Sequence, residues 1–209
     1  MERIEQPRTA RSRRTRSAIL DAAWSLIEER GAEELSMEEI AERAEVSRRA
    51  IYLHFASRAD LLVALMAHLD EKLDLDASMR PVMAAADPVA ALRAWTEHLA
   101  RYHPRILNVA RAVDRARRTD EAAAALWSHA MGAWHDACRR LAARLAEEER
   151  LAEPWTEETA ADMLWALMST DLLEDLTEDC GWSHQRYAEG LFTLVERALV
   201  RRSPSGGQE

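Results

Sequence analysis

SMEEIAERAEVSRRAIYLH, residues 36–54, is the stretch that decides the fold. Ser36 can cap a short helix, and Glu39 stands three residues later, where the second half of a capping box belongs. Ser47 can cap a second short helix in the same way. Helices of this length are marginal alone, so both must pack on a third helix. The stretch therefore predicts two short, capped helices joined by a tight turn.

The second of these helices leaves a basic and aromatic face uncovered. Its apolar side consists of Ala50, Ile51 and Phe55. The side chains left outside are Ser47, Arg48, Arg49, Tyr52, Leu53 and His54. Side chains near the N-terminus of a recognition helix reach base edges in the DNA major groove, while the preceding helix meets backbone phosphate. We therefore expect this face to bind double-stranded DNA.

In this region the chain resembles the tetracycline-repressor (TetR) family of bacterial regulators. The matching pieces are residues 36–41, 46–47, 51–55 and 57–61. Two positions depart from the family pattern, because Glu45 and Ala50 stand where that family often has glycine. Glu45 brings a Cβ atom and a negative charge into the turn, whereas Ala50 still allows close approach of the helix.

The resemblance implies a set of DNA-binding residues with divided roles. The set is Ser36, Ser47, Arg48, Arg49, Tyr52, His54 and Arg58. The two adjacent arginines would read bases, since arginine can grip guanine O6 and N7 together. Ser36, Tyr52, His54 and Arg58 would hold phosphate and set the register. The alternative is an ordinary solvated helix face.

Composition favours an all-α protein. Only six glycines and six prolines occur in 209 residues, and alternating β-branched runs are nearly absent. The two cysteines, Cys138 and Cys180, provide no disulfide framework, so a cytoplasmic location is expected. The chain holds no apolar run long enough for a membrane span.

The distribution of charge matters more than its sum. The net charge is −9, but residues 1–60 carry 11 arginines against 12 acidic residues. Most of these arginines precede the acidic part, so the N-terminal arm is locally basic and suited to phosphate or the minor groove. The alternative for this arm is a solvated tail.

The helical periodicity predicts about nine helices in two domains. Residues 1–10 would form a disordered basic arm, 11–56 a three-helix helix-turn-helix domain, 57–201 a larger ligand-binding and dimerisation domain, and 202–209 a disordered tail. The helix capped by Ser57 is expected to reach Leu75, and Pro104 is expected to end one helix and begin the next. A single helix is expected over residues 156–179.

Aromatic and methionine side chains of the larger domain suggest a ligand cavity. By the resemblance, a small apolar or aromatic effector would bind there, since such walls offer area and adapt in shape. The candidate residues are Trp95, His98, Tyr102, Trp127, Met131, Trp134, His135, Trp165 and Met168. Polar groups able to orient it also include His129, Asp136 and Asp171. The alternative is ordinary core.

No metal site, cofactor or catalytic site is expected. His135 and Cys138 lie one turn apart, but no further ligands stand at metal spacing. A glycine-rich phosphate loop and the G-x-S-x-G and H-E-x-x-H motifs are missing from the sequence. The sequence therefore favours a binding protein over an enzyme.

The last two predicted helices are the candidate dimer interface. Their apolar faces would pair with a symmetry copy as a four-helix bundle, which suits a protein that reads a palindrome. The candidate residues are Leu164, Met168, Tyr187, Leu191, Leu194 and Ala198. The alternative is that both helices complete a monomeric core.

Taken with the resemblance, these features predict a homodimeric transcriptional regulator, a repressor released from a palindromic operator by its effector. Two alternatives stay open. One is a helical small-molecule carrier or enzyme with a vestigial DNA module. The other is a regulator controlled without a ligand.

Overall fold

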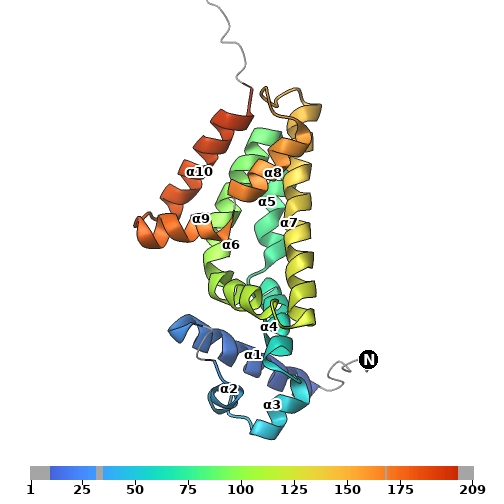
Figure 1. The fold of residues 1–209 in the computed structure, drawn as a ribbon, viewed down its shortest axis with the longest axis vertical. Coiled ribbons are helices and arrows are strands. Elements are labelled where there is room, and N and C mark those ends of the chain that lie inside the picture. Colours follow the sequence, from blue (N-terminus) through green and yellow to red (C-terminus); the bar gives the residue numbers. More distant parts are fainter. Residues whose placement is uncertain (1–9, 32–34, 168, 202–209) are drawn as a thin grey trace, which may run out of the picture. The chain divides into compact units, whose positions relative to one another are not determined.

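The computed structural model describes residues 10–31, 35–167 and 169–201. Ten α-helices and one short π-helix occur in these ranges, where the strand-like element is an isolated bridge between Leu151 and Val200. The prediction of an all-α fold is confirmed (Figure 1). The chain divides into two compact units, with residues 1–73 and 106–128 in unit 1 and residues 74–105 and 129–209 in unit 2.

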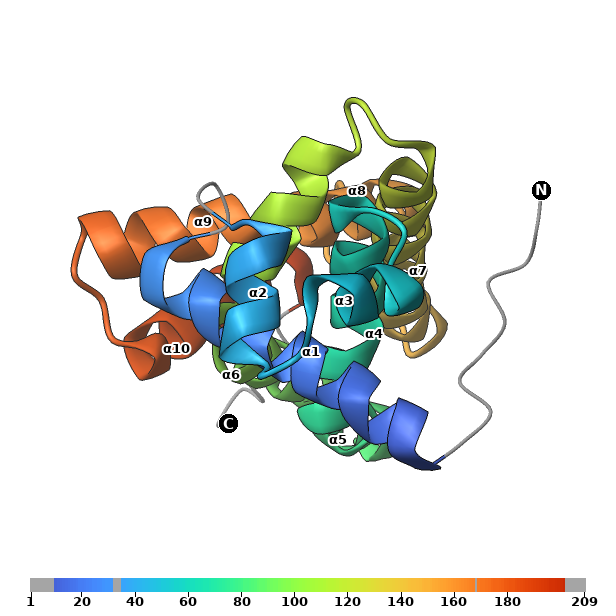
Figure 2. The same ribbon diagram turned by 90° about the horizontal axis from the view of Figure 1, so that it is seen from below.

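Unit 1 begins with four helices, seen from below in Figure 2. They are α1 (Ala10–Arg30), α2 (Met37–Arg43), α3 (Arg48–His54) and α4 (Arg58–Lys72). The end of α6 (Pro88–Ala116) and the start of α7 (Glu121–Glu147) complete the unit.

The core of unit 1 explains why its two shortest helices form. On α1, Ile19, Ala23 and Ile27 recur at helical spacing and are fully buried. Ile40 of α2 and Ile51 of α3 are buried in the same cluster. Burying such a side chain stabilises the fold by about 1.5–3 kcal/mol. That contribution is the support that seven-residue helices lack when isolated.

α4 belongs to the same core as α1. Leu61, Leu62, Leu65 and Leu69 are all buried in the unit 1 cluster. By its packing, unit 1 extends to Leu73 and so includes α4. The boundary expected from the sequence lies after residue 56, before α4. The apolar side chains of α4 would have the same helical spacing in either core, so this spacing alone does not assign α4 to one unit.

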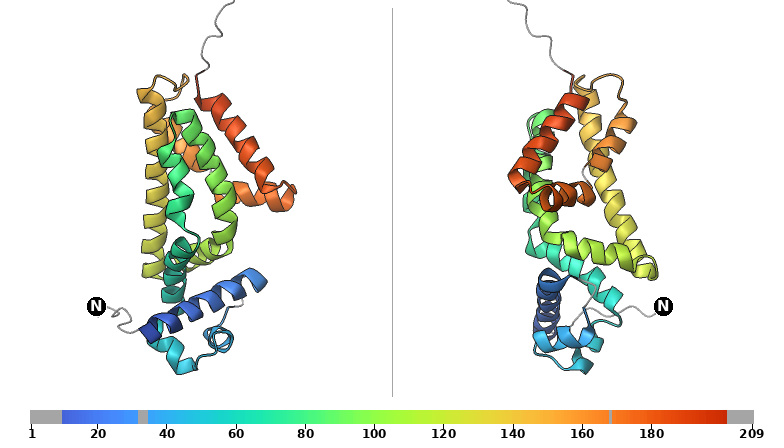
Figure 3. Two further views of the ribbon diagram at one scale, coloured as in Figure 1. Left: turned by 180° about the vertical axis from the view of Figure 1, so that it is seen from behind. Right: turned by 60° about the vertical axis from the view of Figure 1, so that its left-hand side comes forward.

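Unit 2 is built from the C-terminal helices together with the remaining parts of α6 and α7 (Figure 3). Its own elements are α5 (Leu75–Ala84), α8 (Glu157–Leu167), α9 (Thr170–Glu174), the π-helix Asp175–Asp179 and α10 (His184–Leu199). Leu92, Leu99, Leu145, Tyr187 and Val195 lie at the centre of its core.

α5 was not predicted from the sequence. The helix that begins after Ser57 ends at Lys72, short of the expected Leu75. Asp74 then adopts a left-handed conformation with φ of +48°, and its Oδ1 accepts a hydrogen bond from the Ala77 amide at 3.1 Å. This local cap starts a new helix over residues 75–84, where none was expected from the sequence.

Two other helix boundaries differ from the prediction. Pro104 lies inside α6 and does not break it. Proline costs a helix about 3 kcal/mol, but Leu99 before it and Val109 after it are both buried, so packing holds both halves. Conversely, the helix expected over residues 156–179 is divided, because the Ser169 side chain caps the separate helix α9.

Within the described part of the chain, no single helix is long and apolar enough to cross a membrane. The bent pair α3 and α4, at 67°, meets the length and composition criteria only jointly. Ile51 of α3 and the four leucines of the α4 stripe are buried in the unit 1 core, whereas Leu53 of α3 is 75% exposed.

Candidate nucleic-acid interface and ligand site

Serine caps fix both helices of the predicted interface. The Ser36 Oγ accepts a hydrogen bond from the Glu39 amide at 3.2 Å, and the Ser36 amide donates to Glu39 Oε2 at 3.2 Å. The Ser36 hydroxyl donates to the same Oε2 at 2.9 Å, and these bonds lower the pKa of Glu39. The Ser47 Oγ accepts from the Ala50 amide at 3.1 Å. The predicted capping chemistry is therefore present in full at Ser36.

The turn between α2 and α3 depends on Glu45. Its φ is +54°, in the left-handed region that favours glycine. The Glu45 amide donates to the Glu42 carbonyl at 3.1 Å, and the Val46 amide donates to the Ala41 carbonyl at 2.9 Å. This pair of bonds is a Schellman motif, which normally places glycine at the position of Glu45. The glutamate therefore adopts the turn at a conformational cost.

α3 exposes the face that the sequence predicts. Ile51 is fully buried, whereas Tyr52 is 44% and Leu53 75% exposed. The Arg48 side chain is 71% exposed, and its Nη2 lies 2.9 Å from Glu38 Oε1 of α2. Arg49 is exposed and has no ion-pair partner among the described residues. The outward face is thus basic, with one arginine held by a neighbouring carboxylate.

His54 and Arg16 meet around Phe55. The Arg16 guanidinium carbon lies 4.6 Å from the centre of the Phe55 ring, a cation–π contact between α1 and the end of α3. Burial and the nearby Arg16 charge lower the pKa of His54. Both effects disfavour the cationic form of the His54 ring.

Two further contacts, not predicted from the sequence, hold unit 1 together. Arg43 Nη1 and Nη2 lie 2.7 and 2.8 Å from the two carboxylate oxygens of Glu29, and this lowers the pKa of Glu29 to about 2. On α4, His68 Nε2 and Lys72 Nζ lie 2.8 and 2.5 Å from Asp21 Oδ1. These pairs fix α2 and α4 against α1, which orients α3.

Unit 2 contains a buried stack of aromatic rings on α6. The His98 ring centre lies 5.5 Å from that of Trp95 and 5.2 Å from that of Tyr102. The Ser78 hydroxyl lies 2.7 Å from His98 Nδ1. His103, which sequence reasoning missed, contacts the Trp134 ring edge-on at 4.6 Å. Three of the predicted ligand residues are therefore brought together on one helix.

The stack is polar but uncharged. Burial lowers the pKa of His98 to about 4 and that of His103 to about 3, so both are neutral at pH 7. His103 Nδ1 and Trp134 Nε1 are buried without a hydrogen-bond partner in the described residues. Because unpaired buried polar atoms are costly, these two atoms suit a site that a bound molecule completes.

The remaining predicted ligand residues do not join this stack. Trp127 belongs to unit 1, where the Arg117 guanidinium lies 5.1 Å from its ring. His135 lies 2.8 Å from Asp162 and meets the ring of the 39% exposed Trp165 edge-on. Met131 is half-buried on α7, and Met168 lies outside the described residues.

Polar candidates elsewhere are similarly dispersed. His129 and Asp136 are exposed on α7, and Asp136 pairs with Arg139 at 3.0 Å. Asp171 is exposed on α9. Over residues 10–31, 35–167 and 169–201, no group of three or more His, Cys, Asp or Glu side chains could hold a metal ion.

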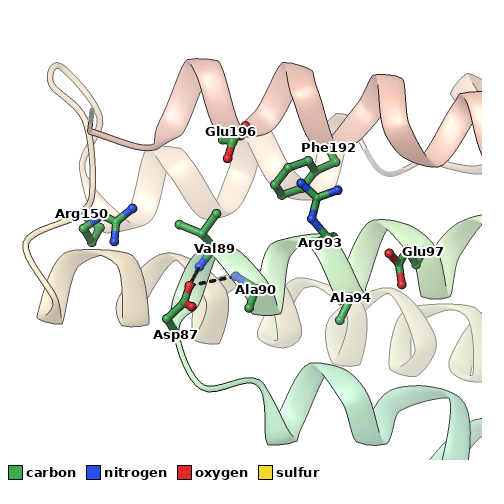
Figure 4. Close-up of a pocket in the computed structure, with 9 residues that line it drawn as sticks. All are labelled: Asp87, Val89, Ala90, Arg93, Ala94, Glu97, Arg150, Phe192 and Glu196. Carbon is green, nitrogen blue, oxygen red and sulfur yellow. Dashed lines mark hydrogen bonds between the residues drawn. The ribbon is translucent and has the colours of Figure 1, made fainter. Parts of the chain in front are cut away.

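Two pockets open on unit 2. One of about 480 Å³ lies between α6 and α10, where Arg93 covers the Phe192 ring at 3.8 Å (Figure 4). Asp87 at its end accepts hydrogen bonds from the amides of Val89 and Ala90, both at 2.9 Å. The other, of about 360 Å³, lies between α5, α6 and α7 and has Trp95 in its wall.

The residues that form the interface match a known family. Residues 19–65 match the family described as bacterial regulatory proteins, tetR family. The HTH-type transcriptional regulator EthR of Mycolicibacterium smegmatis is 30% identical over 164 residues, which are 75% of this chain and 75% of that protein. The chain belongs to the tetR family.

Solved structures extend the similarity beyond the interface of this TetR-family chain. NalD, the secondary repressor of the MexAB-OprM multidrug efflux pump in Pseudomonas aeruginosa, is 25% identical with a TM-score of 0.67, covering 94% of this chain and 100% of NalD. A regulator from Saccharomonospora viridis, solved in complex with choline, is 22% identical with a TM-score of 0.79, covering 91% and 100%. The latter likeness shows the fold alone.

Other curated relatives match less of the TetR-family chain. Three from Pseudomonas putida are 34% to 37% identical over 67 to 79 residues, which are 32% to 50% of their own lengths. The matched segment therefore spans half or less of the length of these relatives.

The predicted dimer residues are divided between core and surface. Leu164 and Tyr187 are fully buried within unit 2, and Leu191 is 4% exposed. Leu194 is 50% exposed, and Ala198 is half-buried. Of the described dimer candidates, Leu194 and the edge of Ala198 are therefore accessible on α10, while the other three side chains fill the core of unit 2.

Proposed function

We propose that this TetR-family chain is a DNA-binding transcriptional regulator that reads operator DNA with α3. The observation that carries the proposal is the exposed face of α3 on a buried three-helix support. Arg49 is exposed there, Arg48 extends beside it, and Tyr52 stands one turn later. Arginine suits guanine recognition, and tyrosine suits phosphate positioning.

Two copies would act together on a palindromic site. A single seven-residue recognition helix contacts few base pairs, so symmetric pairing doubles the surface that reads sequence. The exposed Leu194 on α10 supports pairing through this helix. The acidic balance of the chain, net −9, makes non-specific DNA binding weak and leaves specificity to α3.

A small apolar or aromatic molecule bound in unit 2 would release the operator. The aromatic stack on α6 and the two unpartnered atoms of His103 and Trp134 support such an effector. NalD is a repressor, and the Saccharomonospora viridis protein was solved in complex with choline. Proteins of this fold therefore include a repressor and a protein that binds a small molecule. A coupling of about 1–3 kcal/mol between effector and operator is typical.

The test is an electrophoretic shift with the promoter region beside the protein's own gene, at a stated salt concentration. The wild type and an Arg139→Ala variant should shift the duplex equally, because Arg139 lies in unit 2 on α7. Arg49→Ala should lose most of the shift. Equal shifts by all three proteins, or none by the wild type, would refute the assignment of α3.

A second candidate is a helical small-molecule-binding protein or enzyme whose DNA module is vestigial. The specific observation in its favour is that Glu38 engages Arg48 at 2.9 Å, while Glu45 adds an acidic residue to the turn before α3. Under this reading the wild type gives no shift with any promoter. A regulator controlled without a ligand would bind DNA yet ignore every effector.

A further inference from the structure

The pocket of about 360 Å³ between α5, α6 and α7 has a mainly apolar wall. Three buried side chains line this pocket, each 4% exposed: Val82 of α5, Trp95 of α6 and Leu141 of α7. Met83 of α5 is 67% exposed at its edge. The volume lies within the range of small-molecule sites, and a methionine edge adapts to ligand shape.

α7 places positive charge directly beside this apolar surface. Ala137, Arg140, Leu141 and Arg144 line the pocket at spacings of three and four residues, so they share one face of the helix. Arg140 is exposed, and the described residues give its guanidinium no hydrogen-bond or ion-pair partner. This guanidinium is therefore available to a ligand.

The charges around the pocket are unequal. Arg144 donates one hydrogen bond from Nη2 to the Ala85 carbonyl at 3.0 Å, which leaves its other N–H groups for a second acceptor. Glu147 is the carboxylate in the lining, against the two arginines. Behind the pocket, His98 stacks on Trp95 and adds no charge at pH 7. The lining therefore has a net charge of +1.

We infer that this pocket binds a single-chain amphiphile with one carboxylate, its tail against Val82, Trp95 and Met83 and its carboxylate on Arg140. A guanidinium can hold a carboxylate through two parallel hydrogen bonds. The two arginines would repel a cationic amphiphile. An uncharged amphiphile would leave both guanidinium groups without an anionic partner. The inference rests on the proposed function in one respect, because it takes this pocket, with Trp95 of the α6 stack in its wall, as the effector site of that function and narrows the apolar effector to one that carries a carboxylate.

The test is calorimetric titration of the full-length protein, without DNA, with three probes that each carry one ten-carbon chain, below their micelle concentrations. The probes are decanoate, decan-1-ol and decyltrimethylammonium. Decanoate should bind most tightly, and its affinity should fall as salt is raised. Arg140→Gln should weaken decanoate binding about tenfold, since a hydrogen bond to a charged group contributes about that factor.

Two further variants make the titration specific. Arg139→Gln is the matched control, because Arg139 neighbours Arg140 on α7 but pairs with Asp136 outside the pocket. It should leave decanoate affinity unchanged. Met83→Asp places an acid at the exposed edge of the wall and should weaken decanoate more than decan-1-ol. Both changed side chains are exposed, so circular dichroism should show an intact fold.

Failure of this inference is separable from failure of the proposed function. No decanoate binding, equal affinity for decanoate and decan-1-ol, or unchanged affinity in Arg140→Gln would overturn the inference even if the protein shifts its promoter. Decanoate binding that depends on Arg140, in a protein that binds no duplex, would support the pocket and refute the regulator.

Discussion

At the residue scale, the clearest departure from the family pattern is also a strained position. Glu45 adopts φ of +54° in the turn before α3. The sequence could identify this position only through resemblance, because a glutamate carries no local signal for a left-handed backbone. The serine caps, by contrast, are readable from residues three positions apart, which is why Ser36 and Ser47 were predicted correctly.

Glu45→Gly should raise the free energy of unfolding by about 0.5–1 kcal/mol, because relief of the left-handed conformation exceeds the entropy that glycine adds to the unfolded chain. Urea denaturation followed by circular dichroism measures this. Glu45→Ala is the control, since it removes the charge but keeps the Cβ atom. If alanine stabilises the protein as much as glycine does, the charge and not the backbone is responsible.

Arg48→Ala should weaken binding of the selected operator by about 1–3 kcal/mol and relax preference at one base position. The structure adds that Arg48 is held by Glu38 at 2.9 Å, which sets its direction before DNA arrives. Fluorescence anisotropy with single-base operator variants measures both effects. Unchanged affinity together with an unchanged base preference would remove Arg48 from the set of base-reading residues.

At the element scale, the sequence predicts helices better than it predicts where they stop. The stripe on α1 and the caps of α2, α3 and α4 are local patterns, and the structure has these helices. Pro104 inside α6 and the separate helix α5 depend on packing elsewhere in the chain. His103 was missed for the same reason, since only its burial and its contact with Trp134 distinguish it from a surface histidine.

Two helical glycines provide a matched pair of tests. A Cβ atom added at Gly190 of α10 would lie 2.8 Å from the Trp182 ring, which Arg186 covers at 4.4 Å from its centre, whereas one at Gly132 of α7 would meet nothing within 4 Å. Gly132→Ala should stabilise the protein by about 1 kcal/mol. Gly190→Ala should destabilise it by about 1 kcal/mol after overpacking offsets the same helical gain.

Thermal or urea unfolding compares these two variants directly. The opposite signs are the prediction, because both substitutions bring the same gain in helix propensity and only one meets a neighbouring ring. Equal stabilisation by both variants would show that Trp182 moves aside freely.

The histidines of α6 should make unit 2 sensitive to acid. The pKa of His98 is about 4 and that of His103 about 3 in the folded chain, below the ordinary value of 6.5. The unfolded chain therefore binds more protons below pH 6.5, so stability is constant above that pH and falls as the pH drops towards 4. At pH 5 the loss is about 2 kcal/mol for each histidine.

Urea denaturation at pH 7.5 and pH 5.0 measures this dependence. A His103→Gln variant should lose about half of the difference in stability between the two pH values. His129→Gln, which changes an exposed histidine, should retain all of it. A wild-type stability that is equal at both pH values would contradict the buried, neutral state of both α6 histidines.

At the scale of the whole molecule, the structure brings the two sets of candidate residues together to different degrees. The residues proposed for DNA binding come from one short segment, and five of the seven are exposed, namely Ser47, Arg48, Arg49, Tyr52 and Arg58. The residues proposed for the ligand came from a pattern spread over 74 positions, from Trp95 to Met168, and the structure groups only some of them. Local spacing determines the first set, whereas packing between distant helices determines the second.

The central claim is that α3 reads duplex DNA twice in a symmetric assembly. Selection of bound duplexes from a random library by the purified full-length protein, at low and at physiological salt, tests it most directly. The account predicts enrichment of a palindrome whose half-sites lie about one helical turn apart or a multiple of it, with enrichment abolished by Arg49→Ala. Recovery of duplexes without any common sequence, even at low salt, would contradict it.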